Sequence, residues 1–246
     1  MRATFFTRAF IALGALVVTL GLTQAQPVQL VIWDFNDSDT VADGGLNAAS
    51  SSLALVGGTT ATFATGSPLD TATTNRGYNT TNYPAQGAGN LTAGIVFNTP
   101  TTGYINVTVQ FDLRWSNTAS KFLRFQYTTD GVNWINGNQL VAPGGDSWYS
   151  SQSITNPNGN FRYYASFIGN TAVDNNPNFA FRVVTEFGPN GEYEPARQPD
   201  RSYSTNGTVR YDLVEVRGEV VPEPASMLAL GVGLAGLAGL RRRVKR

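Results

Sequence analysis

Six aromatic side chains in this chain have the chemistry needed to stack against sugar rings. The C–H faces of sugars pack on flat aromatic rings, while neighbouring Asn, Asp and Arg side chains hydrogen-bond to the hydroxyl groups. Trp148 and Tyr149 follow the turn-forming segment Gly144–Ser147, which favours exposure in a loop. We predict that these two residues contact a ligand and that most of the set packs in a core. The set comprises Trp115, Trp134, Trp148, Tyr149, Tyr163 and Tyr164.

Acid–base chemistry has a weaker basis in this sequence. A glycosidase needs two carboxyl groups about 5–10 Å apart, and the sequence supplies no such distance. The candidate carboxylates are Asp112, Asp130, Glu186, Glu192 and Glu194, the last two in a segment typical of a loop. The chain contains no Cys and no His, which excludes zinc sites with those ligands, Cys nucleophiles, Ser-His-Asp triads and disulfides. We therefore predict no catalytic residues and no enzyme activity, with glycan hydrolysis as a distant alternative.

Residues 128–134, Thr-Thr-Asp-Gly-Val-Asn-Trp, look like a shortened Asp-box turn. The pattern Ser/Thr-x-Asp-x-Gly-x-x-Trp occurs in many secreted β-proteins, and this segment is one residue short of it. In such a turn the Asp carboxylate accepts backbone hydrogen bonds and the Trp packs beneath it. We expect Asp130 to stabilise a structural turn, with a ligand site as the alternative.

Strands are expected to position these side chains, because the dominant hydrophobic period is two. From Tyr104 to Trp115, apolar residues alternate with polar ones, which indicates one buried face and one wet face. No stretch between residues 26 and 221 keeps helical spacing over three turns. The same alternation occurs in 122–127, 179–184 and 209–216, and an apolar run over 30–35 opens the domain.

Turn residues separate the expected strands. Asn-Gly begins at 136, 158, 190 and 206, and Asp-Gly at 43 and 130; these dipeptides tolerate the positive φ of tight hairpins. Sheets with one wet face must pair across a core, so we predict an all-β, two-sheet jelly-roll-like sandwich over residues 26–220. A closed barrel is the weaker alternative. From Leu46 to Gly94 we expect long loops with one or two edge strands, over Leu53–Val56 and Thr60–Ala64.

The N-terminus has the pattern of a secretory signal peptide. Arg2 and Arg8 precede an apolar stretch from Ala9 to Leu22, and small residues then favour cleavage after Ala25. We predict a signal peptide over 1–25 that is read by the export machinery, with an uncleaved anchor as the alternative. Residues 26–221 carry ten Arg and Lys against sixteen Asp and Glu, a net charge of −6, which argues against a nucleic-acid partner.

Residues 221–246 combine Val-Pro-Glu-Pro, an apolar run from Met227 to Leu240, and five cations among the last six residues. The run is shorter than the ~20 residues that span a bilayer, so a transmembrane helix here would be short and readily released. These features resemble the PEP-CTERM sorting signal of Gram-negative bacteria, which a membrane-embedded exosortase reads. The resemblance implies processing at Pro222, Glu223 and Pro224 after transient residence in the inner membrane. A permanent tail anchor is the alternative.

The domain between these signals carries two further resemblances. Segments 111–119, 126–131 and 174–183 resemble an extracellular β-sandwich common among PEP-CTERM proteins, which implies an architecture without an assigned activity. The first and last strands are similar to those of jelly-roll carbohydrate-binding modules, many of which hold a structural Ca²⁺. This similarity implies a calcium site at Asp34 and Asp212, since calcium takes six to eight oxygen ligands. The alternative is that both Asp side chains pair with Arg210 or Arg217 on a wet face.

These patterns together predict an exported, non-enzymatic protein of the cell surface or exopolysaccharide matrix. Its predicted role is structural or adhesive, for example in a biofilm. The alternative function is that of a calcium-dependent carbohydrate-binding module whose partner is an extracellular polysaccharide.

Overall fold

The structure is a computed structural model that describes residues 26–148, 162–221 and 231. The described residues form a β-sandwich, and the sequence prediction of an all-β, two-sheet fold is confirmed. In chain order the strands are β1 (Val28–Trp33), β2 (Ser52–Val56), β3 (Thr60–Thr65), β4 (Arg76–Thr81), β5 (Gly94–Asn98), β6 (Tyr104–Trp115), β7 (Phe122–Thr128), β8 (Ile135–Val141), β9 (Ser147–Trp148), β10 (Arg162–Ser166), β11 (Ala180–Glu186) and β12 (Val209–Val220), and a short 3-10 helix, η1 (Ala48–Ser50), precedes β2.

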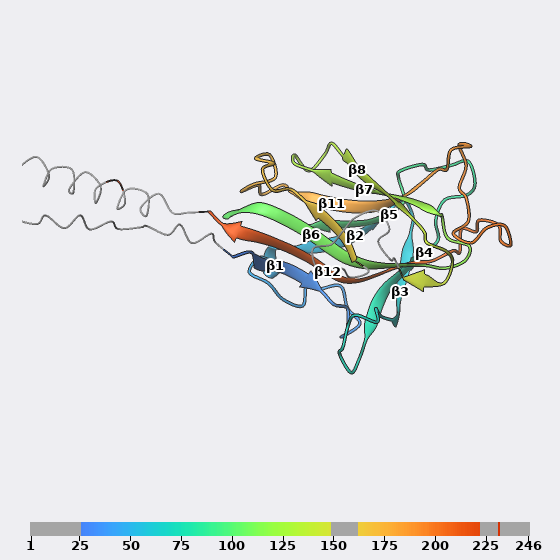
Figure 1. The fold of residues 1–246 in the computed structure, drawn as a ribbon, viewed down its shortest axis with the longest axis horizontal. Coiled ribbons are helices and arrows are strands. Elements are labelled where there is room, and N and C mark those ends of the chain that lie inside the picture. The colour runs from blue at the N-terminus through green and yellow to red at the C-terminus, as the bar shows by residue number, and fades with distance from the viewer. Residues whose placement is uncertain (1–25, 149–161, 222–230, 232–246) are drawn as a thin grey trace, which may run out of the picture.

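The strands build two antiparallel sheets that lie face to face (Figure 1). The seven-stranded sheet has the order β10-β6-β12-β4-β3, with β1 also paired to β12 and β9 to β6. The five-stranded sheet has the order β2-β5-β11-β7-β8. Each sheet buries one face against the other, as two packed antiparallel sheets must when they share one core.

The core consists of the inward residues of both sheets. On β6, residues Val107, Val109, Phe111, Leu113 and Trp115 are fully buried, as the alternation predicts. Aromatic rings connect the layers: the ring centroids of Trp33 and Phe97 lie 5.2 Å apart, and those of Phe125 and Tyr163 lie 5.0 Å apart. Large aromatic side chains bury extensive apolar area, which a domain without disulfides needs.

β12 contains a β-bulge in its middle. Asp212 pairs with Asp112 and Glu215 with Gln110, so β12 uses one residue more than β6 over this interval. Leu213 has a φ of 45° there, in the left-handed region. The bulge puts Val214 in the core and places both Asp212 and Glu215 on the outer face.

Two expectations about strands and turns are wrong. The region from Leu46 to Gly94 contains the two expected strands, β2 and β3, and also β4, which was not expected. The sequence of β4, Arg-Gly-Tyr-Asn-Thr-Thr, is mostly polar and shows no hydrophobic alternation. The Asn-Gly dipeptide at 136 lies within β8 rather than in a turn. A Cβ at Gly137 would lie 2.8 Å from Cδ1 of Phe125, so close approach to that ring, not a hairpin, accounts for this glycine.

The two ends of the domain lie together. Val28 at the start of β1 pairs with Gly218 near the end of β12, and these ends meet at one pole of the sandwich (Figure 1). Ala25, the processing residues Pro222, Glu223 and Pro224, and the expected transmembrane run lie outside the described residues. Among the residues that the structure does describe, no helix is long and apolar enough to cross a bilayer.

Candidate functional site

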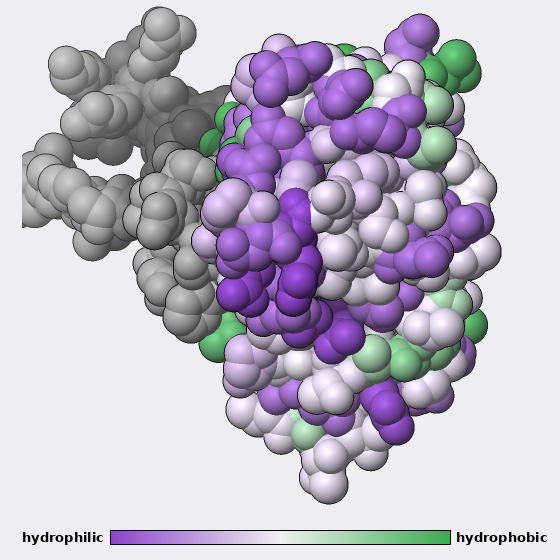
Figure 2. All heavy atoms as spheres, turned by 90° about the vertical axis from the view of Figure 1, so that its right-hand side faces the viewer, coloured by the Kyte–Doolittle hydropathy of each residue, from purple (hydrophilic) through white to green (hydrophobic). Residues whose placement is uncertain are grey.

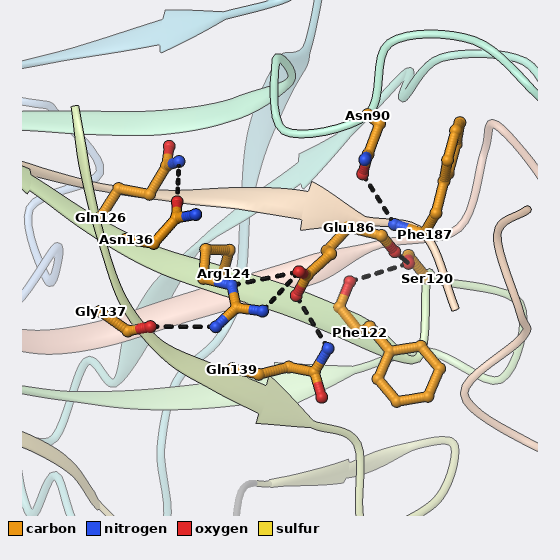
Figure 3. Close-up of polar contacts among 10 residues, drawn as sticks. All are labelled: Asn90, Ser120, Phe122, Arg124, Gln126, Asn136, Gly137, Gln139, Glu186 and Phe187. Atoms are coloured by element: carbon orange, nitrogen blue, oxygen red, sulfur yellow. Dashed lines mark hydrogen bonds and ion pairs between the residues drawn. The ribbon is translucent and has the colours of Figure 1, made fainter. Parts of the chain in front are cut away.

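The outer face of the five-stranded sheet carries a network of charged and amide groups (Figure 3). Arg124 on β7 donates from Nε and Nη2 to Oε1 of Glu186 on β11, with an Nε–Oε1 distance of 3.2 Å. Its Nη1 donates to the carbonyl of Gly137 at 3.0 Å, and Gln139 Nε2 donates to Glu186 Oε2 at 2.9 Å. Both Glu186 oxygens therefore have donors, and the side chains of Arg124 and Glu186 are only 21% and 14% exposed.

An aromatic platform lies next to this network. The Arg182 guanidinium carbon is 4.2 Å from the centre of the Trp134 ring, and burial lowers the pKa of Arg182 from its ordinary value. Arg182 Nε donates to Gln126 Oε1 at 2.6 Å, and Gln126 Nε2 donates to Asn136 Oδ1 at 2.6 Å. Trp134 is only partly buried, so this face combines an aromatic ring with ordered hydrogen-bonding groups. Binding of a sugar ring uses both an aromatic face and hydrogen-bonding groups.

The segment before Trp134 forms the expected turn. Asp130 Oδ1 accepts from the backbone N–H groups of Val132 at 2.9 Å and Asn133 at 2.7 Å, and its Oδ2 accepts from Asn133 Nδ2 at 2.7 Å. The Asn133 side chain and these backbone groups hold the pKa of Asp130 below its ordinary range. These contacts confirm a local turn at Asp130, and Trp134 follows it directly and packs over Arg182.

The outer face of the seven-stranded sheet contains two opposed carboxylates. Asp112 and Asp212 are cross-strand neighbours with exposures of 1% and 0%. Ser67 donates from its backbone N to Asp212 Oδ2 and from its hydroxyl to Asp112 Oδ2, while Arg162 Nε donates to Asp112 Oδ1 at 2.8 Å. Burial raises the pKa of Asp212 to about 7, and burial also raises the pKa of Asp112 against the opposing effect of Arg162. The backbone N of Leu213 donates to Asp212 Oδ1 at 2.7 Å, so each oxygen of this covered pair accepts a hydrogen bond.

The predicted calcium ligands have different surroundings. Asp34 Oδ1 accepts from the backbone N of Asn36 at 3.0 Å, which is a local turn contact. Asp212 Oδ2 packs tightly against Gly66, where an added Cβ would lie 2.4 Å from that oxygen and 1.8 Å from Asn75 Oδ1. Asn75 Oδ1 is buried and has no hydrogen-bond donor. The oxygens of Asp212 and Asn75 are therefore close neighbours, whereas Asp34 makes only its local contact.

Other features of the metal hypothesis are less favourable. Within residues 26–148 and 162–221, no three or more His, Cys, Asp or Glu side chains are grouped to hold a metal ion. The alternative of Arg partners for Asp212 is wrong. Arg210 donates to Thr65 O and Asn79 Oδ1, and Arg217 donates to Glu215.

The expectation that most of the aromatic set packs in the core is wrong for the described residues, of which two of five are fully buried. Trp115 and Tyr163 are fully buried, whereas Trp134, Trp148 and Tyr164 are partly buried. Trp148 lies in the two-residue strand β9, opposite Arg114 of β6, rather than in a loop. Backbone pairing with β6 explains this difference, and Arg114 also forms a 3.1 Å ion pair with Asp146. Tyr149 lies outside the described residues.

Several residues of the two outer faces were not singled out from the sequence. Ser67 and Arg162 reach Asp112 and Asp212 from distant segments, Asn75 Nδ2 donates to Ser67 O, and no local sequence pattern predicts those contacts. Glu215 had a usable signal: the consecutive apolar residues Leu213-Val214 interrupt the alternation at the position of the bulge.

Comparisons with solved structures find distant likenesses. The N-terminal CBM22-1–CBM22-2 tandem domain of Paenibacillus barcinonensis Xyn10C is 9% identical, with a TM-score of 0.45 over 82% of this chain and 48% of that one. The CBM22-1–GH10 modules of Clostridium thermocellum xylanase 10B, complexed with xylohexaose, are 10% identical, with a TM-score of 0.43 over 80% of this chain and 29% of that one. SGBP-B from a complex xyloglucan utilization locus in Bacteroides uniformis is 10% identical, with a TM-score of 0.37 over 78% of this chain and 50% of that one.

This chain thus spans half or less of each of those structures, and the likenesses carry no argument about ligands. No curated protein sequence matches the chain. The family model of the PEP-CTERM protein-sorting motif matches residues 220–243, directly after the body of β12. The chain therefore carries a PEP-CTERM sorting motif, which implies recognition by an exosortase and export as a substrate that passes through a membrane.

Proposed function

We propose that this protein is a non-enzymatic component of the cell surface or exopolysaccharide matrix of a Gram-negative bacterium. In this proposal it leaves the cytoplasm through a signal peptide cleaved after Ala25, is held briefly in the inner membrane, and is processed by an exosortase at Pro222-Glu223-Pro224. The observation that carries the proposal is the sorting motif over residues 220–243.

The position of the motif relative to the fold supports this processing. β12 ends at Val220, and the backbone N of Val221 still donates to Gly103 O at 2.9 Å. β1 begins at Val28, beyond the proposed signal cleavage. Removal of residues 1–25 and 225–246 therefore leaves every described strand complete. A processed protein would keep its whole core and its stability outside the membrane.

The surface is consistent with a hydrated matrix. The net charge of −6 over residues 26–221 disfavours binding to nucleic acid. At the pole opposite the start of β1, hydrophilic side chains dominate and hydrophobic groups occur in small separate areas (Figure 2). The exposed large hydrophobic residues lie at scattered chain positions, such as Leu46, Val132 and Ile168. Single exposed apolar groups of this kind are normal for a soluble surface.

Processing is tested with the full-length chain in a host that contains exosortase. Glu223→Ala should accumulate uncleaved in the inner-membrane fraction, because the enzyme reads the Pro-Glu-Pro segment. Glu192→Ala, in the loop after β11, is the matched control and should be processed like the wild type. Equal release of the Glu223→Ala and wild-type chains would contradict the proposal.

Carbohydrate binding is the second candidate function. Trp134 over Arg182, beside Gln126 and Asn136, favours it because the ring is partly exposed and its polar neighbours are held in place. Trp148 and Tyr149 remain proposed ligand contacts, and Asp34 and Asp212 remain the proposed ligands of a structural Ca²⁺, with Asn75 Oδ1 as a further oxygen close to Asp212. Binding of the exported protein to the producer's polysaccharide should weaken on Trp134→Ala or Trp148→Ala and in EDTA. Unchanged binding in all three cases would remove these roles.

Glycan hydrolysis remains the distant alternative. Asp112 and Asp212, the directly opposed carboxylates, are 1% and 0% exposed and lie beneath Ser67. We therefore expect no hydrolysis when the purified protein is incubated with a broad glycan panel. Release of reducing ends from any glycan, lost on a carboxylate substitution, would overturn the non-enzymatic assignment.

A further inference from the structure

A polar groove crosses the outer face of the seven-stranded sheet. It has a volume of about 420 Å³ and is lined by side chains of β6, β10 and β12. This volume lies within the range of small-ligand sites in proteins. The groove is on the sheet opposite the Trp134 platform, so it is a separate surface.

The bulge in β12 supplies the floor of this groove. By shifting the register after Asp212, it directs Glu215 outward, where this side chain would otherwise have faced the core. Glu215 is 5% exposed and its Oε1 accepts from Gln29 Nε2 at 2.8 Å and from Arg217 Nε at 2.7 Å. Its Oε2 accepts from Gln110 Nε2. The carboxylate is thus fixed by three donors from three strands.

The fixed carboxylate orders groups that remain available to a ligand. Burial opposes ionisation of Glu215, but its three hydrogen bonds hold its pKa below the ordinary value, so the anchor stays charged at neutral pH. Arg217 contacts Glu215 through Nε while its side chain is 46% exposed, which leaves its terminal nitrogens facing solvent. Asn106 Nδ2 is held by Glu219 Oε2 at 2.9 Å along the same wall.

An aromatic ring borders the groove at the edge of the sheet. Tyr164 on β10 is partly buried and lines this groove and also a second hollow of about 400 Å³. The second hollow lies between β10 and the β7–β8 edge, with Tyr127, Phe167 and Asn138 among its walls. Tyr164 therefore borders two hollows along the edge strand. Two hollows that share a lining residue suit an extended chain of sugars better than a single ring.

The charges around the groove select the class of chain. Arg162 and Arg217 are the cations, and Asp112, Glu215 and Glu219 are the anions that they or Asn106 contact. This set has a net charge of −1, so a polymer of uronates or sulfates would meet no excess of positive charge. We propose that the groove binds an uncharged, extended polysaccharide, with Tyr164 as the stacking ring and Arg217, Gln110 and Asn106 as hydroxyl partners.

This inference rests on carbohydrate binding, the second candidate function, and assigns that binding to a different surface. The test is affinity electrophoresis of the mature exported protein in gels that contain hydroxyethyl cellulose, galactomannan or alginate. We expect retardation by at least one of the two uncharged polymers and none by alginate. Tyr164→Ala and Arg217→Ala should each weaken the retardation about tenfold, whereas Tyr164→Phe should retain it because the ring remains.

Control variants separate this site from the other face. Arg197→Ala removes a cation whose side chain is 51% exposed and should change nothing. Trp134→Ala should leave binding in the groove intact. If Trp134→Ala abolishes retardation and Tyr164→Ala does not, the groove assignment is wrong while carbohydrate binding stands. If alginate alone retards the protein, the charge argument is wrong. If none of the three polymers does, both the groove and the carbohydrate-binding candidate fail.

Thermal melting of each variant identifies any loss due to unfolding, and Arg217→Ala, at an exposed position, provides the decisive result if Tyr164→Ala does not fold.

Discussion

The two outer faces of this sandwich hold partly or fully buried charges in opposite ways. On the five-stranded face, Arg124 and Glu186 pair one to one, and both carboxylate oxygens accept from donors. On the seven-stranded face, Asp112 and Asp212 oppose each other across β6 and β12, and Arg162 is the one guanidinium hydrogen-bonded to the pair in the described part of the chain. Asn75 Oδ1 adds a further buried acceptor without a donor near Asp212.

This difference shows that the charges on a sheet face can either balance one another or need a proton or a cation from the solvent. The Arg124–Glu186 network pairs one cation with one carboxylate and satisfies its own polar groups. Each carboxylate oxygen of the Asp112–Asp212 pair also accepts a hydrogen bond, but Arg162 is the one charged donor among these four, and like charges that are directly opposed destabilise a sheet. A proton or a cation must therefore determine the stability of that face.

The largest effect on stability should come from adding a side chain at Gly66, which packs against Asp212. Gly66→Ala would place a Cβ within 1.8 Å of Asn75 Oδ1 and 2.4 Å of Asp212 Oδ2, so the free energy of unfolding should fall by about 2–3 kcal/mol. In the control Gly44→Ala, the nearest atom is Ile32 Cγ2 at 3.5 Å, an ordinary contact, and the change should be below about 0.5 kcal/mol. Urea unfolding measures both. Equal losses of unfolding free energy in the two variants would show that Gly66 is not tightly packed.

The pH dependence should be the next largest difference between the faces. The folded-state pKa of Asp212, about 7, exceeds the ordinary 3.8, so its contribution to stability is complete below about pH 4 and is lost as the pH rises through 7. From pH 5 to 8 the wild type should lose on the order of 2 kcal/mol relative to Asp212→Asn. Calcium at pH 8 should restore part of the wild-type stability and leave the variant unchanged. Parallel unfolding curves for the two proteins, with and without EDTA, would refute this account.

Breaking the Arg124–Glu186 network should have a smaller cost. Arg124→Ala leaves Glu186, 14% exposed, without its guanidinium, and should lower the free energy of unfolding by about 1–2 kcal/mol. Adding Glu186→Gln should recover part of this loss, because no unpaired charge then remains. Arg197→Ala is the control, since its 3.7 Å pair with Asp200 is exposed and should contribute almost nothing. A double variant no more stable than the single would contradict the pairing.

The smallest effect concerns Asp130, whose pKa shift has the opposite sign to that of Asp212. Its folded-state pKa is depressed by Asn133 and backbone donors, so its stabilisation is present above the usual 3.8 and is lost as the pH falls through the folded-state value. Asp130→Asn should lower the melting temperature slightly at neutral pH, and by less in strong acid. The same deficit at both pH values would show that charge plays no part in the turn.

The sequence predicts local periodicity much better than long-range contacts. β6 has the expected bounds, Tyr104–Trp115, because twelve residues alternate without interruption. The calcium hypothesis paired Asp212 with Asp34, but the structure gives Asp212 other hydrogen-bond partners. Ser67, its actual neighbour, is 145 residues away in the chain and lies in an irregular loop. Periodicity carries no information about such a contact.

The groove illustrates the same limit in one strand. The alternation in 209–216 predicts β12 but not the bulge, because the energy of the left-handed Leu213 depends on what the flanking residues bury. Tyr164 was among the aromatic residues singled out, yet its place between two hollows follows from β10 lying at the sheet edge. Edge positions are properties of the assembled sheet.

The most direct test of the proposed function is mass spectrometry of the protein from otherwise identical hosts with and without exosortase. With the enzyme, we expect a released chain that begins at residue 26 and ends within or next to Pro222-Glu223-Pro224. Without it, the chain should remain in the inner membrane and retain its C-terminal residues through Arg246. A released chain with the same C-terminus in both hosts would contradict the account.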